Sequence, residues 1–81
     1  MLISVRLFAS VREAVGSNSV TLDLPEGATV STLTADMLAR YPEVRVLTEA
    51  RVSVNFEYVA GDHPIREGDD LAVIPPVSGG Q

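Results

Sequence analysis

Cysteine and lysine are both absent from this sequence of 81 residues, in which all six basic residues are arginine. Without cysteine the chain has no disulfide, no thiolate zinc site, no cysteine-ligated iron–sulfur cluster and no cysteine nucleophile. Without lysine it has no side-chain amine to which a second protein could be joined through an isopeptide bond. These classes of covalent and metal chemistry are therefore excluded for the side chains.

The chain also lacks clusters of positive charge and long apolar runs. A net charge of -5 and arginines scattered singly argue against a nucleic-acid surface, because phosphate contacts need clustered basic side chains. The negative net charge favours a partner protein whose contact surface is basic. No stretch approaches the roughly 20 apolar residues that span a bilayer, and residues 1–6 do not resemble a signal peptide. We expect a cytoplasmic protein that binds neither nucleic acid nor membrane.

Length sets a further limit. A chain of 81 residues forms one hydrophobic core, and a domain of this size buries only roughly 60% of the surface that it exposes when unfolded. Little stability is then left to support a deep, polar, water-excluding active site. We expect one domain that is not an enzyme on its own.

Two helices are predicted from capping residues and apolar spacing. Ser10 and Glu13 have the spacing of a capping box and predict a short helix, which Gly16 would close in a left-handed conformation. A longer helix is predicted from Thr29, as its N-cap, to Pro42, because apolar residues recur between them at helical spacing. This second helix is the main one.

Five segments have the apolar alternation and flanking turn residues of strands. They are residues 3–7, 20–24, 52–54, 58–59 and 71–73. Two strands, a helix and then short strands predict an α+β fold of the β-grasp type, a mixed sheet of four to five strands packed on one main helix. A right-handed crossover would place the first and last strands side by side.

The composition changes after Ile74, so we expect the β-grasp domain to span residues 1–74. Residues 75–81 read Pro-Pro-Val-Ser-Gly-Gly-Gln. The two prolines stop the sheet because they lack backbone donors, and the two glycines lose the most entropy on ordering. We expect a flexible C-terminal tail over residues 75–81, about 20 Å long if stretched.

Several stretches carry a family resemblance: residues 5–9 and 11–16, residues 52–55, and residues 62–65 with 67–80. They are similar to the small subunits of molybdopterin synthase, which are ubiquitin-like sulfur carriers of the MoaD/ThiS family. The likeness covers nearly the whole chain. Its most specific part is the proline pair that precedes a valine and a double glycine.

The resemblance implies a reaction cycle at the tail. An E1-like adenylyltransferase would adenylate the carboxylate of Gly80 with ATP and magnesium, and a sulfur donor system would convert the acyl adenylate to a thiocarboxylate. The tail, with Gly79 beside Gly80, would enter the large synthase subunit and pass sulfur to cyclic pyranopterin monophosphate in molybdenum cofactor biosynthesis. Two small and two large subunits would form a heterotetramer. The chain itself is expected to bind no cofactor and no metal.

The resemblance also implies a docking surface. It places apolar residues against the large subunit at Phe8 and Ile74, and the contact would continue along the tail through Pro75, Pro76, Val77 and Ser78. Core packing is the alternative for Phe8 and Ile74, because strand periodicity does not say which face of the sheet the helix covers. Glycine suits positions 79 and 80, since a Cβ would collide with the walls of a narrow channel.

Gln81 departs from the family pattern, which ends at the second glycine. Three interpretations stay open: a hydrolase removes Gln81 before activation, Gln81 is not part of the working protein, or this copy is not a sulfur donor.

Two other functions also stay open. A sulfur carrier for thiamine thiazole or for tRNA thiolation would have the same paired glycines, although residues 75–77 and 62–64 favour the molybdopterin branch. A non-conjugating β-grasp binding module would use only its sheet face, and would not need residues 79–81.

Overall fold

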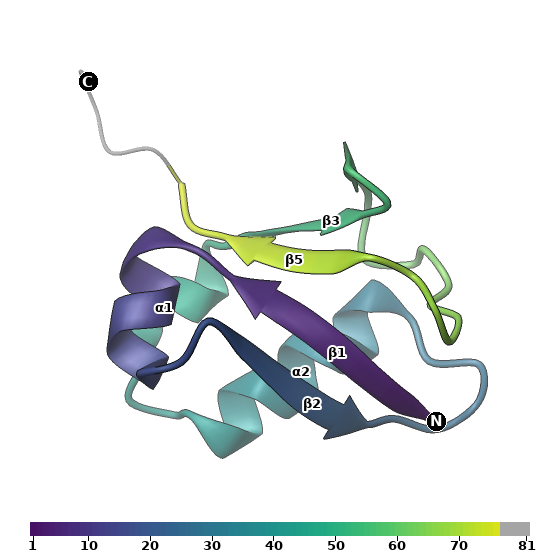
Figure 1. The fold of residues 1–81 in the computed structure, drawn as a ribbon, viewed down its shortest axis with the longest axis horizontal. Helices are drawn as coiled ribbons and strands as arrows, with labels where there is room; N and C mark the ends of the chain where they lie inside the picture. The colour runs from purple at the N-terminus through teal and green to yellow at the C-terminus, as the bar shows by residue number, and fades with distance from the viewer. Residues whose placement is uncertain (77–81) are drawn as a thin grey trace.

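Five strands form one mixed sheet in residues 1–76, the part of the chain that the computed structural model describes (Figure 1). The strand order is β2-β1-β5-β3-β4. The strands are β1 (Leu2–Leu7), β2 (Ser19–Asp23), β3 (Arg51–Val54), β4 (Glu57–Tyr58) and β5 (Leu71–Ile74). β1 and β5 are parallel, and the other three pairings are antiparallel. The predicted adjacency of the first and last strands is therefore confirmed.

The last strand, β5, occupies the centre of the sheet. On one side it pairs with β1, with Leu7 opposite Val73, and on the other it pairs with β3, with Arg51 opposite Ile74. A strand that is hydrogen-bonded on both sides has no free edge and is held in one register. The point at which the chain leaves the sheet is thereby fixed.

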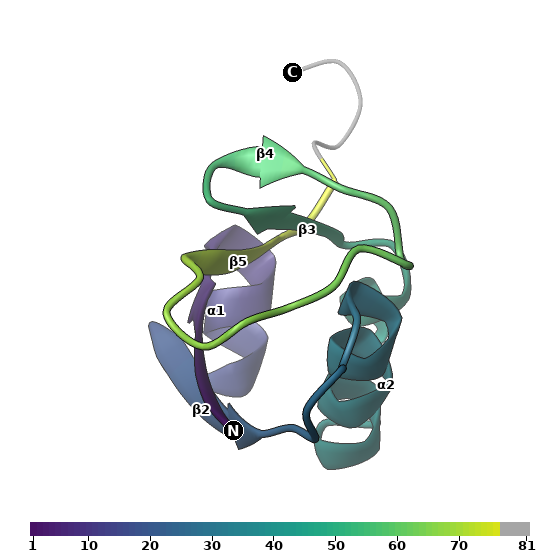
Figure 2. The same ribbon diagram turned by 90° about the vertical axis from the view of Figure 1, so that its right-hand side faces the viewer.

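The helices lie on one side of the sheet, and α2 (Val30–Arg40) runs across that face (Figure 2). The predicted N-cap of α2 is confirmed: Thr29 Oγ1 accepts from the backbone N–H of Thr32, while the backbone N–H of Thr29 donates to Thr32 Oγ1. Tyr41 caps the other end, just before Pro42, which cannot continue a helix. A short 3₁₀ helix, η1 (Arg45–Thr48), follows.

The predicted capping box of the first helix is wrong. Helix α1 (Ala9–Val15) begins directly after β1, with Phe8 as its N-cap and no side-chain capping bond. The Phe8 carbonyl accepts from the N–H groups of Val11 and Arg12, so the helix starts too early for Ser10 to be its cap. This early start places Val11 fully in the core. Gly16 closes the helix in the left-handed region, at φ 88°, as predicted.

The core lies between the helices and one face of the sheet. Alternate residues of β1 are buried, because successive side chains of a strand point to opposite faces. From the sheet the core receives Ile3, Val5, Leu7, Leu22, Val52, Val54, Leu71 and Val73, and from α2 it receives Val30, Leu33 and Met37. We call the opposite side of the sheet, which carries Leu2, Ser4 and Arg6 of β1, the outer face.

This arrangement is the expected α+β fold of the β-grasp type. The short edge strand falls one residue earlier than predicted, at Glu57–Tyr58. No helix in residues 1–76 is long and apolar enough to cross a membrane.

Replacing Leu71 with alanine tests whether β5 contributes to the core as its burial indicates. Leu71 is 1% exposed, so the free energy of unfolding should fall by about 2–5 kcal/mol through lost apolar burial and a residual cavity. Leu2→Ala is the matched control: Leu2 is 64% exposed, and its replacement should change stability by less than about 0.5 kcal/mol. Denaturant unfolding measures both, and equal losses would contradict the assignment of β5 to the core.

Candidate docking site at the root of the tail

The site begins where β5 ends, at residues 74–76, which we call the tail root. Ile74 is half-buried, Pro75 is buried and Pro76 is exposed. A proline has no N–H with which to extend the ladder between β3 and β5, so pairing stops at Ile74. Four of the residues assigned to the tail by resemblance lie outside the described residues; they are Val77, Ser78, Gly79 and Gly80.

A hollow of about 330 Å³ lies beside the tail root. It is lined by Arg51, Tyr58, Ile74, Pro75 and Pro76. The guanidinium carbon of Arg51 lies 5.4 Å from the centre of the Tyr58 ring, within the range of a cation–π contact. The root of the tail is therefore flanked by one arginine stacked on one aromatic ring.

Phe8 and Ile74, the two residues with alternative assignments to core or interface, lie on the outer face. Leu7 and Val73 are buried toward the helices, so the residues that follow them point the other way. Neither Phe8 nor Ile74 belongs to the buried core, and both are half-buried. Since Leu7 is opposite Val73 in adjacent strands, Phe8 and Ile74 lie at neighbouring positions on the outer face.

Arg6 connects Phe8 to the β3–β4 hairpin. Its guanidinium carbon lies 5.6 Å from the centre of the Phe8 ring and 5.7 Å from that of Phe56. Nη2 of the same side chain lies 2.9 Å from Oδ1 of Asp70. We call Arg6, Phe8 and Phe56 the outer-face cluster. Because Asp70 neutralises its arginine, the cluster is aromatic and carries little net charge.

Two small residues, Ala72 and Ser53, lie at the centre of the outer face. Ala72 of β5 is opposite Arg6 of β1 on one side and opposite Ser53 of β3 on the other. Ala72 is 2% exposed and Ser53 is 8% exposed, although the helices cover the other face of the sheet. Small side chains here let larger neighbours, such as Arg6 and Tyr58, cover the backbone of the sheet.

The β3–β4 turn consists of two residues with positive φ, Asn55 at 53° and Phe56 at 73°. Positive φ at both central residues is the pattern of a type I′ hairpin turn. Asn55 ties this turn to the next loop: its Nδ2 donates to Asp69 Oδ1 at 3.2 Å, and its Oδ1 accepts from the N–H of Asp70 at 3.0 Å. Both polar atoms of the Asn55 side chain therefore hold the hairpin turn against the loop that contains Asp69 and Asp70.

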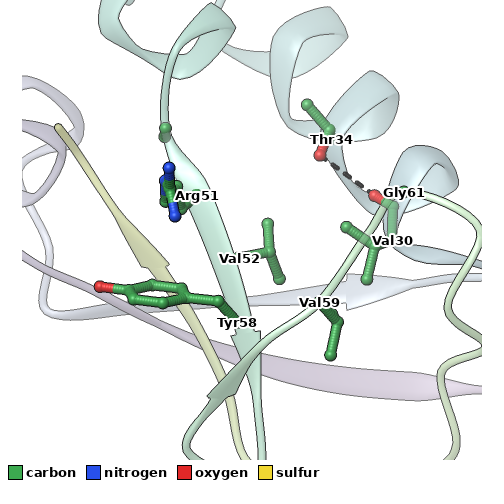
Figure 3. A pocket seen from close by; sticks show the side chains of 8 residues that line it. Val30, Thr34, Arg51, Val52, Tyr58, Val59 and Gly61 are labelled. Carbon is green, nitrogen blue, oxygen red and sulfur yellow. Dashed lines mark hydrogen bonds between the residues drawn. The ribbon is translucent and has the colours of Figure 1, made fainter.

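A second hollow, of about 460 Å³, lies between α2 and the β3–β4 hairpin (Figure 3). It is lined by Val30, Thr34, Ala50, Arg51, Val52, Tyr58, Val59 and Gly61. The Thr34 hydroxyl is engaged, because it donates to the Val30 carbonyl at 3.0 Å. The lining holds no carboxylate or imidazole that could serve as a general base. Within residues 1–76, no three His, Asp or Glu side chains gather as metal ligands would.

Sequence patterns alone give no binding role to Arg6, Phe56 or Tyr58, which the structure places between the tail root and the β3–β4 turn. Strand alternation marks Arg6 only as a polar position, and it places Tyr58 only in a short strand. A signal for Phe56 does exist in the sequence, since Asn-Phe stands where a two-residue hairpin turn favours Asn-Gly. Arg6 had no such signal.

Comparison with known proteins identifies relatives along the whole chain. The model of the ThiS family matches residues 5–80. A molybdopterin synthase sulfur carrier subunit from Dictyostelium discoideum is 38% identical, over 94% of this chain and 93% of the relative. The protein of that name from Escherichia coli is also 38% identical, over 98% of this chain and all of the relative.

Solved structures show the same fold. SAMP1 from Haloferax volcanii has a TM-score of 0.84 at 31% identity and covers 99% of this chain and all of its own. A putative molybdopterin converting factor subunit 1 from Pyrococcus furiosus has a TM-score of 0.83 at 28% identity, over 95% of this chain and 99% of its own. A complex of subunits 1 and 2 of molybdopterin-converting factor from Helicobacter pylori matches at 20% identity and a TM-score of 0.71, over 99% of this chain and all of the matched chain, which supports the fold alone.

The anchoring of the hairpin can be tested by replacing Asn55 with alanine. This change removes two side-chain hydrogen bonds and leaves alanine at positive φ, so the free energy of unfolding should fall by about 1–3 kcal/mol. Asn18→Ala is the control, because Asn18 is exposed and only its backbone carbonyl is bonded within residues 1–76. Hydrogen exchange of the β3 and β4 amides should accelerate in the first variant only; unchanged exchange in both would contradict the anchoring.

Proposed function

Because this chain belongs to the ThiS family and aligns over nearly its full length with molybdopterin synthase sulfur carriers, we propose that its tail carries sulfur for molybdenum cofactor biosynthesis. Its partner in that role is the large subunit of molybdopterin synthase. The β-grasp domain holds and presents the tail, and the covalent chemistry takes place at Gly80. We further propose that the protein works in the cytoplasm, as two small subunits bound to two large ones.

One observation carries the proposal: the tail starts from the central strand of the sheet, beside apolar residues of the outer face. β5 is bonded to strands on both sides and ends at Ile74, and Pro75 is buried directly after it. A fixed root lowers the entropy that is lost when the segment beyond it enters a partner. The family match extends through Gly80, so the presented segment includes both glycines.

The proposed chemistry has two activation steps. The carboxylate of Gly80 attacks the α-phosphorus of magnesium-bound ATP in an E1-like adenylyltransferase, and pyrophosphate leaves. A hydrosulfide equivalent from the sulfur donor system then attacks the acyl carbon, and AMP leaves to give a thiocarboxylate. Adenylation is needed because a free carboxylate has a poor leaving group.

Transfer takes place in the large subunit. The thiocarboxylate sulfur attacks a carbon of cyclic pyranopterin monophosphate and forms a carbon–sulfur bond, while a carbon–oxygen bond at the same carbon breaks and the oxygen leaves as water or phosphate. Water then attacks the acyl carbon, so that the sulfur stays on the pterin and a carboxylate is regenerated on Gly80. Two such transfers supply the two sulfurs of a dithiolene. Because Gln81 follows Gly80, the proposal includes hydrolysis of the peptide bond between them before the first activation.

In this proposal Phe8, Ile74 and Pro76 contact the large subunit. All three lie at or beside the tail root, and none belongs to the core. Pro75 is buried in the isolated chain, so its role in the proposal is to fix the direction of the root. Val77 and Ser78 continue from there toward the glycines in sequence.

Protein modification is a second candidate, favoured by the match to SAMP1, a small archaeal modifier protein, at 31% identity over nearly the whole chain. In that case a lysine amine of a target attacks the Gly80 acyl adenylate, AMP leaves and an isopeptide bond forms. Because this chain has no lysine, it cannot extend itself into a polymer through side-chain amines.

Replacing Gly80 with alanine tests sulfur transfer by the tail separately from the stability of the folded domain. Gly80→Ala should lower the rate of sulfur transfer by about 100-fold, because a methyl group shifts the reacting carbon in a narrow channel, while the free energy of unfolding stays unchanged. Gly68→Ala is the matched control: Gly68 has a φ of 91° with open space around it, so alanine should cost about 1–2 kcal/mol of stability and leave transfer intact. Equal transfer rates in the two variants would contradict the role of Gly80.

Intact mass spectrometry of the protein from its own cell tests the loaded state. The expected form ends at Gly80 and is heavier by the replacement of one oxygen with one sulfur. An isopeptide remnant of the tail on lysines of other proteins would favour modification instead. A pool that is unprocessed and unmodified during active cofactor synthesis would refute both functions.

A further inference from the structure

We propose that Phe56, at the tip of the β3–β4 hairpin, is a second anchor for the subunit that receives the tail, and that it inserts into an apolar pocket of that subunit. This inference rests on the proposed function and adds a contact that is remote from the tail in the sequence. Four properties of the residue support it: its exposure, its backbone conformation, the rigidity of its turn and its place on the outer face.

Phe56 is the most exposed large apolar residue of the described chain. Its exposed fraction is 78%, compared with 64% for Leu2 and 57% for Tyr58. Phenylalanine is a large apolar side chain, so leaving it in water gives up the favourable free energy of burying its ring. It makes no contribution to the buried core, so its size is not explained by packing within the domain.

The backbone at Phe56 is unfavourable for a bulky residue. Its φ of 73° lies in the left-handed region, which an L-residue with a Cβ occupies at a cost. The other positive-φ positions of the described chain carry glycine (Gly16, Gly27 and Gly68) or the smaller side chains of Ala9 and Asn55, so Phe56 is the largest residue held in this region. Glycine would also be the favoured residue at the second position of this turn. The sequence therefore places an aromatic ring where folding alone favours glycine, and such strain is characteristic of binding sites.

The turn that carries the Phe56 ring is anchored by contacts within the chain itself. Asn55, the preceding residue, is bonded through its side chain to Asp69 and Asp70, and its N–H donates to the Asp70 carbonyl at 2.8 Å. Arg6, fixed by its own ion pair with Asp70, lies over the Phe56 ring. A preorganised aromatic loses little conformational entropy on binding, which is the property of an interface anchor.

Phe56 lies beside the start of β5, at the other end of that strand from the tail root, and the outer-face cluster connects the two. Arg6 bridges its ring to that of Phe8, at 5.7 and 5.6 Å, and Phe8 neighbours Ile74 across the β1–β5 pair. One partner that accepts the tail beyond Ile74 and covers Phe8 therefore meets Phe56 on the same face. Since Asp70 neutralises Arg6, the complementary pocket is apolar and not acidic.

The test is the affinity of the full chain for the large synthase subunit of the same organism, measured by titration calorimetry. Phe56→Gly should weaken binding by about 10-fold or more, as expected for loss of an aromatic anchor. Its unfolding temperature should stay the same or rise, because glycine accepts the turn conformation without strain. A loss of binding together with retained stability is the result that a purely structural role for Phe56 does not give.

Matched variants keep the outcome interpretable. Phe56→Asn also tolerates positive φ and should weaken binding as much as glycine, which guards against a folding defect of one variant. Phe56→Trp keeps an aromatic ring and should stay within about 3-fold of the parent. Leu2→Ser removes a comparably exposed apolar side chain from the far end of β1 and should leave affinity unchanged.

Two results would overturn the inference, and they differ. If the parent binds the large subunit and both Phe56→Gly and Phe56→Asn bind equally well, the second anchor is refuted and the proposed function stands. If the parent itself does not bind the large subunit, the proposed function fails and the anchor fails with it.

Discussion

The pairing of β5 between β1 and β3 is the constraint on which the rest of this molecule depends. These are the last strand of the described chain, the first and the third, and their hydrogen bonds close a sheet whose ends would otherwise be separate. The pairing brings Leu71 and Val73 into the core from one face of β5, and it leaves Ala72 and Ile74 on the other. It also fixes where Pro75 begins. The register of β5 against β1 and β3 therefore determines which of its residues enter the core, which lie on the outer face and where the tail root begins.

A small domain of this kind separates stability from chemistry. Its core uses one face of the sheet and the helices, and neither hollow near the tail root contains a base or a metal-ligand set. In the proposed function the covalent steps fall instead on Gly79 and Gly80, which have no side-chain bulk. The folded domain provides a fixed starting point for that segment and a surface that a partner can bind.

The outer face has a composition that differs from an ordinary solvated sheet. Small residues, Ala72 and Ser53, form its floor, while aromatic rings and arginines rise around them. The guanidinium groups of Arg6 and Arg51 are each stacked on an aromatic ring, and that of Arg6 is also paired with Asp70. Together with the strained turn at Phe56, this gives a preformed surface beside the tail.

Sequence patterns by themselves determined the β-grasp class, the Thr29 cap, the left-handed Gly16 and the strand positions, because these depend on local periodicity and on single-residue conformational preferences. The family resemblance gave Gly79 and Gly80 their expected role, and it did so from the sequence alone. The face of the sheet that carries Phe8 and Ile74 was decided only by tertiary structure, since alternation defines two faces without saying which one the helices cover. The N-cap of α1 was likewise decided by tertiary structure: it is Phe8 and not Ser10, and Val11 of this helix is fully buried in the core. The meeting of Arg6, Phe8 and Phe56 likewise depends on strand pairing between residues far apart in the chain, which no local pattern encodes.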